Sequence, residues 1–588
     1  MLSSIKVQLI CWGLISLATI RCSPALTVLG RLDRCQRELE MSRLPFANIK
    51  TADGSIEAPY LVCSFSQLNE IRNYLDSHFI LGANIDASVA RVSGAYVDPD
   101  EISNSGDEYF EGWDPIGEES LAFTGSLDGN GKKISNLYIY SPKSRHSALF
   151  ASTCQKTSPE SSSCEKSALF IKDLTLDNLS IVGGEKAAGV AVFLGNTAVN
   201  NVNISGSIVG DEVGGIAVDS FSDISNVISK ATVESRSGTA GGIVANLFSG
   251  MFAAVSNRGD VFGGGEVVGG LVGLVKSDSD VIFNSVEMSG QTVSRSDSEV
   301  YSGGAIGVVE SALKVDVVNS YVSGAVDATF EASLSYVGGF IGVVKDGNSV
   351  LFENVFNLGN VEGTRNVGGI VGEGKSMTFQ RVFSRGMIHG QDAGGLVGRA
   401  SESNIYDSYV SSELVSGVRG AGGLIGSGAK IQVRRSYSNS NVESRDGSLG
   451  GFWGAVVSGG SIDDSFLGVG YLEVTGSRRR PRYGILAGSI RSLEVSQTFV
   501  SDNFNIVTGR GPPEDQGEAF ETQIDSLLRG PLVLGNSGAG EIFENWNFDE
   551  LWSMKSGEYP FLKCPSDDEN TEEDESWIWA CSIWNDAQ

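Results

Sequence analysis

The residues that could carry out chemistry are few in this chain of 588 residues, and they stand apart from one another. Its three histidines are His78, His146 and His389, and none lies in the His-Glu-x-x-His arrangement that a zinc peptidase needs. Isolated histidines also provide no Ser-His-Asp or Cys-His pairing for nucleophilic catalysis. The glycine clusters precede no helix pattern, which argues against a phosphate-binding loop. We therefore expect no catalytic, cofactor-binding or metal-ligating residues.

Paired carboxylates are the remaining source of acid and base catalysis. The pairs Asp211-Glu212 and Asp463-Asp464 could serve an enzyme that acts on polysaccharides, as the two carboxylates of a glycoside hydrolase do. Both pairs lie in turn-rich sequence between predicted strands, where acidic side chains are usually solvated. A carbohydrate-active enzyme, either a polysaccharide lyase or a glycoside hydrolase, is therefore the alternative and not the main interpretation.

Two acidic turns and one basic cluster raise the question of ion binding. The turns KSDSD (276–280) and RSDSE (295–299) supply the oxygen ligands that Ca²⁺ prefers, so Ca²⁺ is an alternative to solvated turns. The cluster SRRRPRYG (477–484) could hold an anionic sugar or be a proteolysis site, but a solvated loop is the simpler interpretation. The formal net charge of −29 opposes contact with phosphate backbones, and we expect no nucleic-acid partner.

The first 25 residues have the pattern of a secretory signal peptide. Lys6 precedes an apolar run, and Ser23-Pro-Ala25 offers small residues at a cleavage point. The run is shorter than the roughly 20 apolar residues of a membrane-spanning helix. We predict a secreted, extracellular or cell-surface protein with no transmembrane segment in the mature chain.

The cysteines agree with export. Cleavage after Ala25 would leave six of them, an even number that suggests disulfide bonds in an oxidising compartment. Sequence proximity favours the pairs Cys35–Cys63, Cys154–Cys164 and Cys564–Cys581, although other pairings of the six remain open.

A repeated phrase dominates the middle of the chain. Nine Gly-Gly pairs follow one another at intervals of about 30 residues, the signature of a solenoid or propeller. Their first glycines are Gly214, Gly241, Gly269, Gly303, Gly338, Gly368, Gly394, Gly422 and Gly450. Each period holds about three short strand patterns without hairpin signals, so each strand should pair with its counterpart one period later. A propeller blade usually needs about 40 residues or more, which favours a parallel solenoid of about 13 coils over residues 123–507.

The Gly-Gly pairs predict a corner in every coil. Glycine tolerates positive φ and close approach of backbones, and both properties suit a tight bend. Two apolar residues follow in nearly every copy, as in Leu271-Val272 and Ile370-Val371. Strict alternation would point one of the two outward. Either a bend at the glycines buries both residues, or an apolar stripe runs along the exterior.

An aromatic column keeps the same period. Its members are Tyr321, Phe356, Phe383, Tyr409, Tyr437 and Phe466. Two residues before three of them stand Arg381, Asp407 and Arg435. Because burying these charges would be costly, we expect a corner there, with the aromatic rings turned into the core. An exposed track of rings that suits the faces of pyranoses is the alternative.

The two ends of the array differ from its middle. Residues 26–122 contain a short amphipathic helix pattern with Leu68, Ile71 and Leu75 on one face, and we interpret them as an N-terminal cap with mixed helix and strand. Residues 508–565 are rich in Trp, Phe and Tyr and are predicted to cap the other end. Residues 566–588 form an acidic tail that ends in a Trp-rich stretch.

The repeats resemble the GLUG-motif family of secreted and surface proteins, named for Gly-Leu-any-Gly. Three copies match that motif outright: Gly270-Leu271-Val272-Gly273, Gly395-Leu396-Val397-Gly398 and Gly423-Leu424-Ile425-Gly426. The segments at 67–88 and 123–139 and the closing "W…YPFL" block are similar to the family's cap, opening and closing segments. The resemblance covers most of residues 58–563. It implies an exported right-handed β-helix with an adhesin-like role, and some members carry the array beside a metallopeptidase, which the isolated histidines here oppose.

These observations combine into one interpretation. The chain is predicted to be all-β, a right-handed parallel β-helix with caps at both ends. Its predicted work is non-catalytic binding or adhesion outside the cell, with surface glycans, extracellular matrix or cell-surface proteins as partners. A purely structural spacer is a further alternative.

Overall fold

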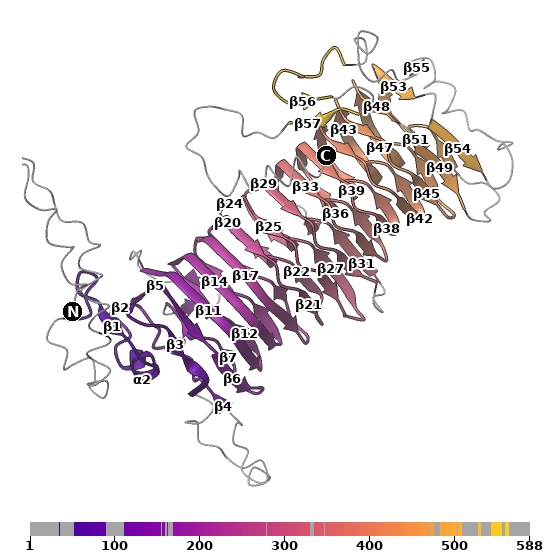
Figure 1. Ribbon diagram of the computed structural model, residues 1–588. Helices are drawn as coiled ribbons and strands as arrows, with labels where there is room; N and C mark the ends of the chain where they lie inside the picture. The colour runs from indigo at the N-terminus through magenta and orange to yellow at the C-terminus, as the bar shows by residue number, and fades with distance from the viewer. Residues whose placement is uncertain are drawn as a thin grey trace, which may run out of the picture.

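The fold is a long stack of parallel coils (Figure 1). The computed structural model describes residues 35, 52–89, 111–154, 156–158, 161–162, 169–277, 279–329, 334–345, 347–468, 470–475, 482–501, 504–508, 527–530, 543–554 and 559–563. Strand β14 (Thr197–Gly210) pairs in parallel with β11 (Leu169–Gly183) of the preceding coil and with β17 (Ile224–Ser235) of the following coil. The same relation repeats up to β54 (Phe504–Thr508). The predicted parallel β-helix is confirmed.

The Gly-Gly pairs lie where the backbone of each coil approaches two neighbours at once. A Cβ added at Gly423 would lie 2.1 Å from the Gly451 carbonyl oxygen of the next coil and 2.3 Å from Oγ of Ser438, on a separate strand of its own coil. All of these pairs lie in the described part of the chain, and none of their glycines has positive φ. The expected close approach is confirmed, and the expected need for positive φ at these pairs is wrong.

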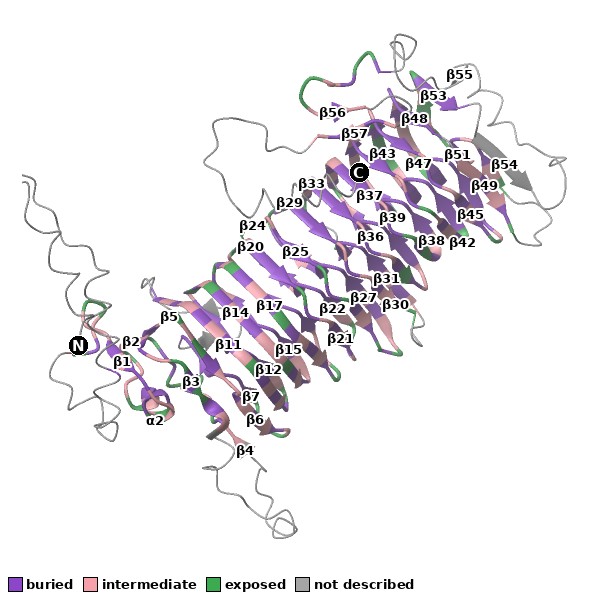
Figure 2. Ribbon diagram, in the orientation of Figure 1, coloured by how far each residue is buried: buried purple, intermediate pink, exposed green. Residues whose placement is uncertain are grey.

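The bend at the glycines buries both apolar residues that follow. Leu271 and Val272 are fully buried in the main core, as are their counterparts in later coils, so no apolar stripe forms there on the exterior. A second, separate apolar cluster contains residues that precede the glycines, such as Val337 and Val367. The glycines therefore lie between two apolar compartments of the coil, a division the sequence did not suggest. Figure 2 shows this buried interior running through the stack.

The predicted second corner is present, and it is made by residues with left-handed φ. We call these residues the corner column. In chain order they are Asp173, Asn201, Asn226, Ala254, Ser285, Asn319, Asn354, Arg381, Asp407, Arg435, Asp464 and Gln497, with φ between 41° and 56°. Asn and Asp tolerate this backbone conformation better than other non-glycine residues, because their short polar side chains bond locally. The expectation that the charged residues mark a corner is therefore confirmed.

The N-terminal end of the stack is covered by a small mixed unit. Helix α2 (Phe65–Glu70) begins after Ser64, whose hydroxyl accepts a hydrogen bond from the backbone N–H of Gln67 at 3.3 Å. Beside it, β1 (Tyr60–Val62) pairs with β2 (His78–Leu81), which continues the stack into β5 (Ser126–Ser135). The predicted Cys35–Cys63 disulfide bond is present. Cys154 is also disulfide-bonded, whereas Cys164, Cys564 and Cys581 lie outside the described residues.

Candidate functional site

The aromatic column forms a continuous ladder of stacked rings. Neighbouring ring centroids from Tyr321 to Phe466 are 4.6–5.1 Å apart, and the ring planes differ by no more than 12°. All six rings are buried. Because Val355 belongs to the main core and its neighbour Phe356 does not, the rings stand on the outer side of the coil. A buried ladder is confirmed, and the expectation that it turns inward is wrong. We call it the outer aromatic ladder.

A segment from the C-terminal region covers part of this ladder. Residues 543–554 and 559–563, the C-terminal cover, include the small antiparallel sheet of β56 (Trp552–Ser553) and β57 (Phe561–Leu562), which lies beside the stack (Figure 1). The Tyr437 hydroxyl donates to the Pro560 carbonyl at 2.6 Å, and the Trp546 indole donates to the Asp464 carbonyl at 2.9 Å. The cover contacts the rings of Tyr409, Tyr437 and Phe466, so these rings point outward and are still buried. The packing opposes an exposed sugar-binding track at this part of the ladder.

The acidic pairs that could have formed a catalytic site are engaged in ion pairs between coils. Asp211 contacts Arg236 at 3.2 Å, and Glu212 contacts Lys186 at 3.4 Å. At the other pair, Arg434 lies 3.4 Å from Asp463 and 3.5 Å from Asp464. The basic groups that contact both pairs therefore come from adjacent coils.

The three histidines and the two acidic turns also lie apart from one another. His78 is on β2, His146 is on β7 (His146–Ser147) with Glu119 at 3.2 Å, and His389 is exposed on β38 (Ile388–Gly394). In the turn at 276–280, Asp278 is not among the described residues, and in the turn at 295–299 the hydroxyls of Ser296 and Ser298 contact each other at 2.8 Å.

The described residues offer no cluster of ligands for a metal ion. Among these described residues no group of three or more His, Cys, Asp or Glu side chains is placed to hold a metal ion. Most of the basic cluster at 477–484 lies outside them, and Arg482 at its end is exposed.

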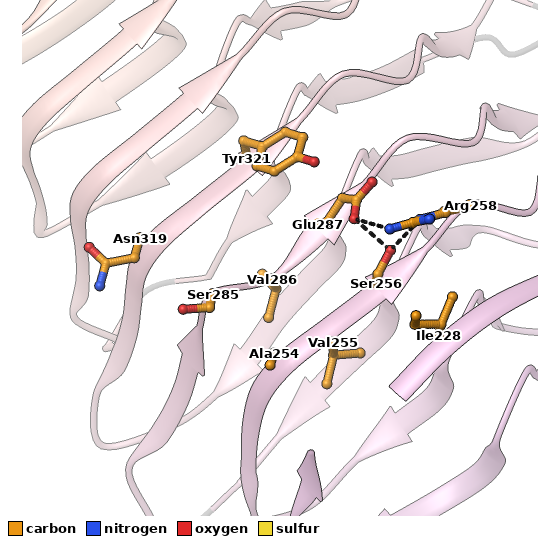
Figure 3. Close-up of a pocket in the computed structure, with 10 residues that line it drawn as sticks. All are labelled: Ile228, Ala254, Val255, Ser256, Arg258, Ser285, Val286, Glu287, Asn319 and Tyr321. Atoms are coloured by element: carbon orange, nitrogen blue, oxygen red, sulfur yellow. Dashed lines mark hydrogen bonds and ion pairs between the residues drawn. The ribbon is translucent and has the colours of Figure 1, made fainter. Parts of the chain in front are cut away.

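A cavity of about 210 Å³ lies at the N-terminal end of the outer aromatic ladder (Figure 3). Its polar wall is Glu287, which accepts hydrogen bonds from the Ser256 hydroxyl at 2.7 Å and from the Arg258 guanidinium at 3.3 Å. Tyr321, the first ring of the ladder, adjoins Glu287 in the next coil. Burial and the neighbouring Glu287 carboxylate raise the pKa of the Tyr321 phenol well above its ordinary value, so this ring is neutral.

The column of the outer aromatic ladder and the corner column both carry smaller side chains at this cavity. This change of residue type explains why the cavity exists. In the ladder column, register pairs Ile228 with Ser256, Ser256 with Glu287, and Glu287 with Tyr321, so no aromatic ring occupies these coils. Beside it, the corner column carries the short side chains of Ala254 and Ser285. Sequence reasoning missed these residues because each is ordinary alone. Aligning the coils would have revealed the gap.

Comparison with known proteins gives partial matches only. No protein-family model matches the chain. Over 176 residues it is 32% identical to halomucin of Haloquadratum walsbyi, a match that covers 29% of this chain and 2% of halomucin. Over 100 residues it is 33% identical to a protein named as a Gly-rich membrane protein of Evansella cellulosilytica, covering 17% of this chain and 10% of that protein. The chain thus spans only a small part of either relative.

One solved structure resembles this chain weakly. The crystal structure of a protein assigned as an immunoglobulin A1 protease from Bacteroides ovatus aligns with 87% of this chain and 95% of its own, at 13% identity and a TM-score of 0.24. A likeness of this size carries no argument about function. Among the described residues, no helix is long and apolar enough to cross a membrane.

Proposed function

We propose that this protein is a non-catalytic binding or adhesion protein that works outside the cell or at its surface, with glycans as partners. It would belong with the GLUG-motif proteins, whose repeat it resembles. The cavity at the end of the outer aromatic ladder carries the proposal, because it places an aromatic ring and one carboxylate beside apolar side chains. Such a mixture of apolar surface and few polar groups is typical of recognition sites.

The single carboxylate in the cavity is what separates binding from catalysis. Hydrolysis of a glycosidic bond ordinarily uses two carboxyl groups that flank the bond. Here Glu287 is the one acidic side chain lining the described cavity, and it is bonded to Arg258 and Ser256. The position of the protein outside the cell is supported by the Cys35–Cys63 disulfide bond, since such bonds persist in oxidising compartments. The names of the relatives, a halomucin and a Gly-rich membrane protein, favour the same place.

A glycan array with the purified full chain tests this function. We expect binding to a defined set of glycans, followed by no release of reducing sugar and no unsaturated product when the bound glycans are incubated with the protein. Product formation would instead establish the enzyme alternative, and the absence of binding to any glycan would refute a glycan-binding role.

A further inference from the structure

The corner column shows that the cavity is an interruption of a regular pattern. Elsewhere in this column amide side chains bond from coil to coil: Asn201 donates to Asp173 at 2.7 Å, and Asn354 donates to the Asn319 amide oxygen at 2.8 Å. Ala254 stands in the same column with φ 54° and has no side chain that could bond in this way. A left-handed conformation is unfavourable for alanine and is better tolerated by asparagine. The chain therefore keeps a small, strained residue where its own pattern would place a larger and more suitable one.

The polar wall points to the kind of ligand. Glu287 is 7% exposed, and its carboxylate keeps acceptor capacity beyond the bonds from Ser256 and Arg258. The Arg258 side chain is 38% exposed, and an ion pair with one exposed member contributes little to stability. A strained backbone and a buried carboxylate beside a cavity are features that concentrate at functional sites.

We propose that this cavity binds a single pyranose ring of a neutral glycan. A pyranose has one apolar face and a rim of hydroxyl groups. Over the short Ser256 side chain, the apolar face would lie against Ile228, while the hydroxyls would donate to Glu287 and accept from Arg258. A uronate or phosphate would meet the Glu287 carboxylate and a chain with a net charge of −29, which disfavours anionic ligands. This inference rests on the glycan-binding function proposed above and assigns its site.

The sharpest test fills the cavity without damaging the fold. Ala254→Asn restores the residue type that the corner column uses, so its melting temperature should equal or exceed that of the wild type, while its amide group would occupy the ligand's space. Ser376→Asn is the matched control, because Ser376 has φ 57° at a different corner, away from the cavity. Binding would be measured by saturation-transfer NMR with the methyl glycosides of glucose, galactose, mannose and N-acetylglucosamine.

We expect the wild type and Ser376→Asn to bind the same glycoside, and Ala254→Asn to lose at least about tenfold in affinity. Glu287→Gln keeps the volume of the side chain and removes its charge, and it should also weaken binding about tenfold, because hydrogen bonds to charged groups are the stronger ones. If the wild type binds glycans on the array but Ala254→Asn and Glu287→Gln bind them equally well, the assigned site is wrong and the proposed function stands. If the wild type binds neither the array nor the glycosides, both are refuted.

Discussion

Replacing Gly423 by alanine tests the physical role of the Gly-Gly pairs. The added Cβ would lie 2.1 Å from the Gly451 carbonyl oxygen and 2.3 Å from Oγ of Ser438, whereas ordinary contacts begin near 3.4 Å. The backbone must therefore move by about 1 Å away from two neighbours at once, in a core where overpacking costs about 1–3 kcal/mol. Gly420→Ala is the matched control in the same coil, because its Cβ would meet only the flexible Asp392 carboxylate at 3.0 Å and backbone at 3.5 Å.

The magnitude follows from what the displacement disturbs. The amide of Gly423 bonds to the Gly450 carbonyl at 3.4 Å and the amide of Leu424 bonds to the Phe452 carbonyl at 2.9 Å. Each such bond contributes about 0.5–1.5 kcal/mol, and the stiffer unfolded chain of the alanine variant returns about 0.4–1 kcal/mol. We therefore expect Gly423→Ala to lower the free energy of unfolding by about 3 kcal/mol, and Gly420→Ala to change it by no more than about 0.5 kcal/mol.

Amide hydrogen exchange is the direct assay, since it reports opening of individual coils. A loss of about 3 kcal/mol corresponds to exchange about a hundredfold faster at the amides of the disturbed coil. Trp453 provides a second readout, because it is fully buried and pairs with Ile425 in the adjacent coil. Urea unfolding followed by tryptophan fluorescence should show the same order of stability. If Gly423→Ala and Gly420→Ala prove equally stable, the close approach does not require glycine and the reasoning fails.

Three further predictions concern the ladder, the corner column and the N-terminal coils. Tyr437→Phe removes the bond to Pro560 and should weaken docking of the C-terminal cover by about 1 kcal/mol, seen as faster protease cleavage of the cover while the coils stay intact; unchanged cleavage would contradict it. Asp407→Asn removes the charge and leaves one acceptor oxygen in place of the two that accept bonds of 2.6 and 2.7 Å from Arg435, so it should lower the free energy of unfolding in urea by about 2 kcal/mol. A change within experimental error would show that this pair does not stabilise the fold. Burial, ahead of the opposing effect of a nearby carboxylate, lowers the pKa of His146 below its ordinary 6.5, so the unfolded chain takes up the proton first as pH falls. The stability this residue contributes above pH 6.5 is lost below it, and the melting temperature should drop more for the wild type than for His146→Gln between about pH 7 and pH 5.

The coils and the register between them could be predicted, because residues one period apart in the sequence lie beside each other on adjacent coils. Once Gly269 and Gly303 are aligned, every residue between them acquires a counterpart, and the observed register follows that alignment. The corner at Asp407 could be predicted as well, because a charged residue between two core residues can stay out of the core only where the chain bends. For the two apolar residues after each Gly-Gly pair, the sequence left two alternatives: a bend that buries both residues, or an apolar stripe on the exterior. The structure shows the bend, with both residues buried.

The orientation of the ladder could not be predicted from the repeat alone. The cost of burying Arg381 predicts a corner there, but a corner does not decide on which side of the coil Phe383 lies. The outward position of the ring needs a partner that covers it. That partner is distant in sequence, since Tyr437 and Pro560 are separated by 123 positions along the chain. The cavity could not be predicted for a different reason. It exists because Ala254 and Ser285 have small side chains, and small side chains form no recognisable sequence motif.

The cover also fixes an order of events in the making of this protein. Synthesis delivers the coils before the C-terminal cover, so for an interval the rings from Tyr409 to Phe466 face water as a contiguous apolar strip. Two nascent rods that meet during this interval can stick side to side through those strips. Proteolytic removal of the C-terminal cover from a folded molecule would expose the same rings. Cleaved molecules should therefore associate under conditions in which intact molecules stay dispersed.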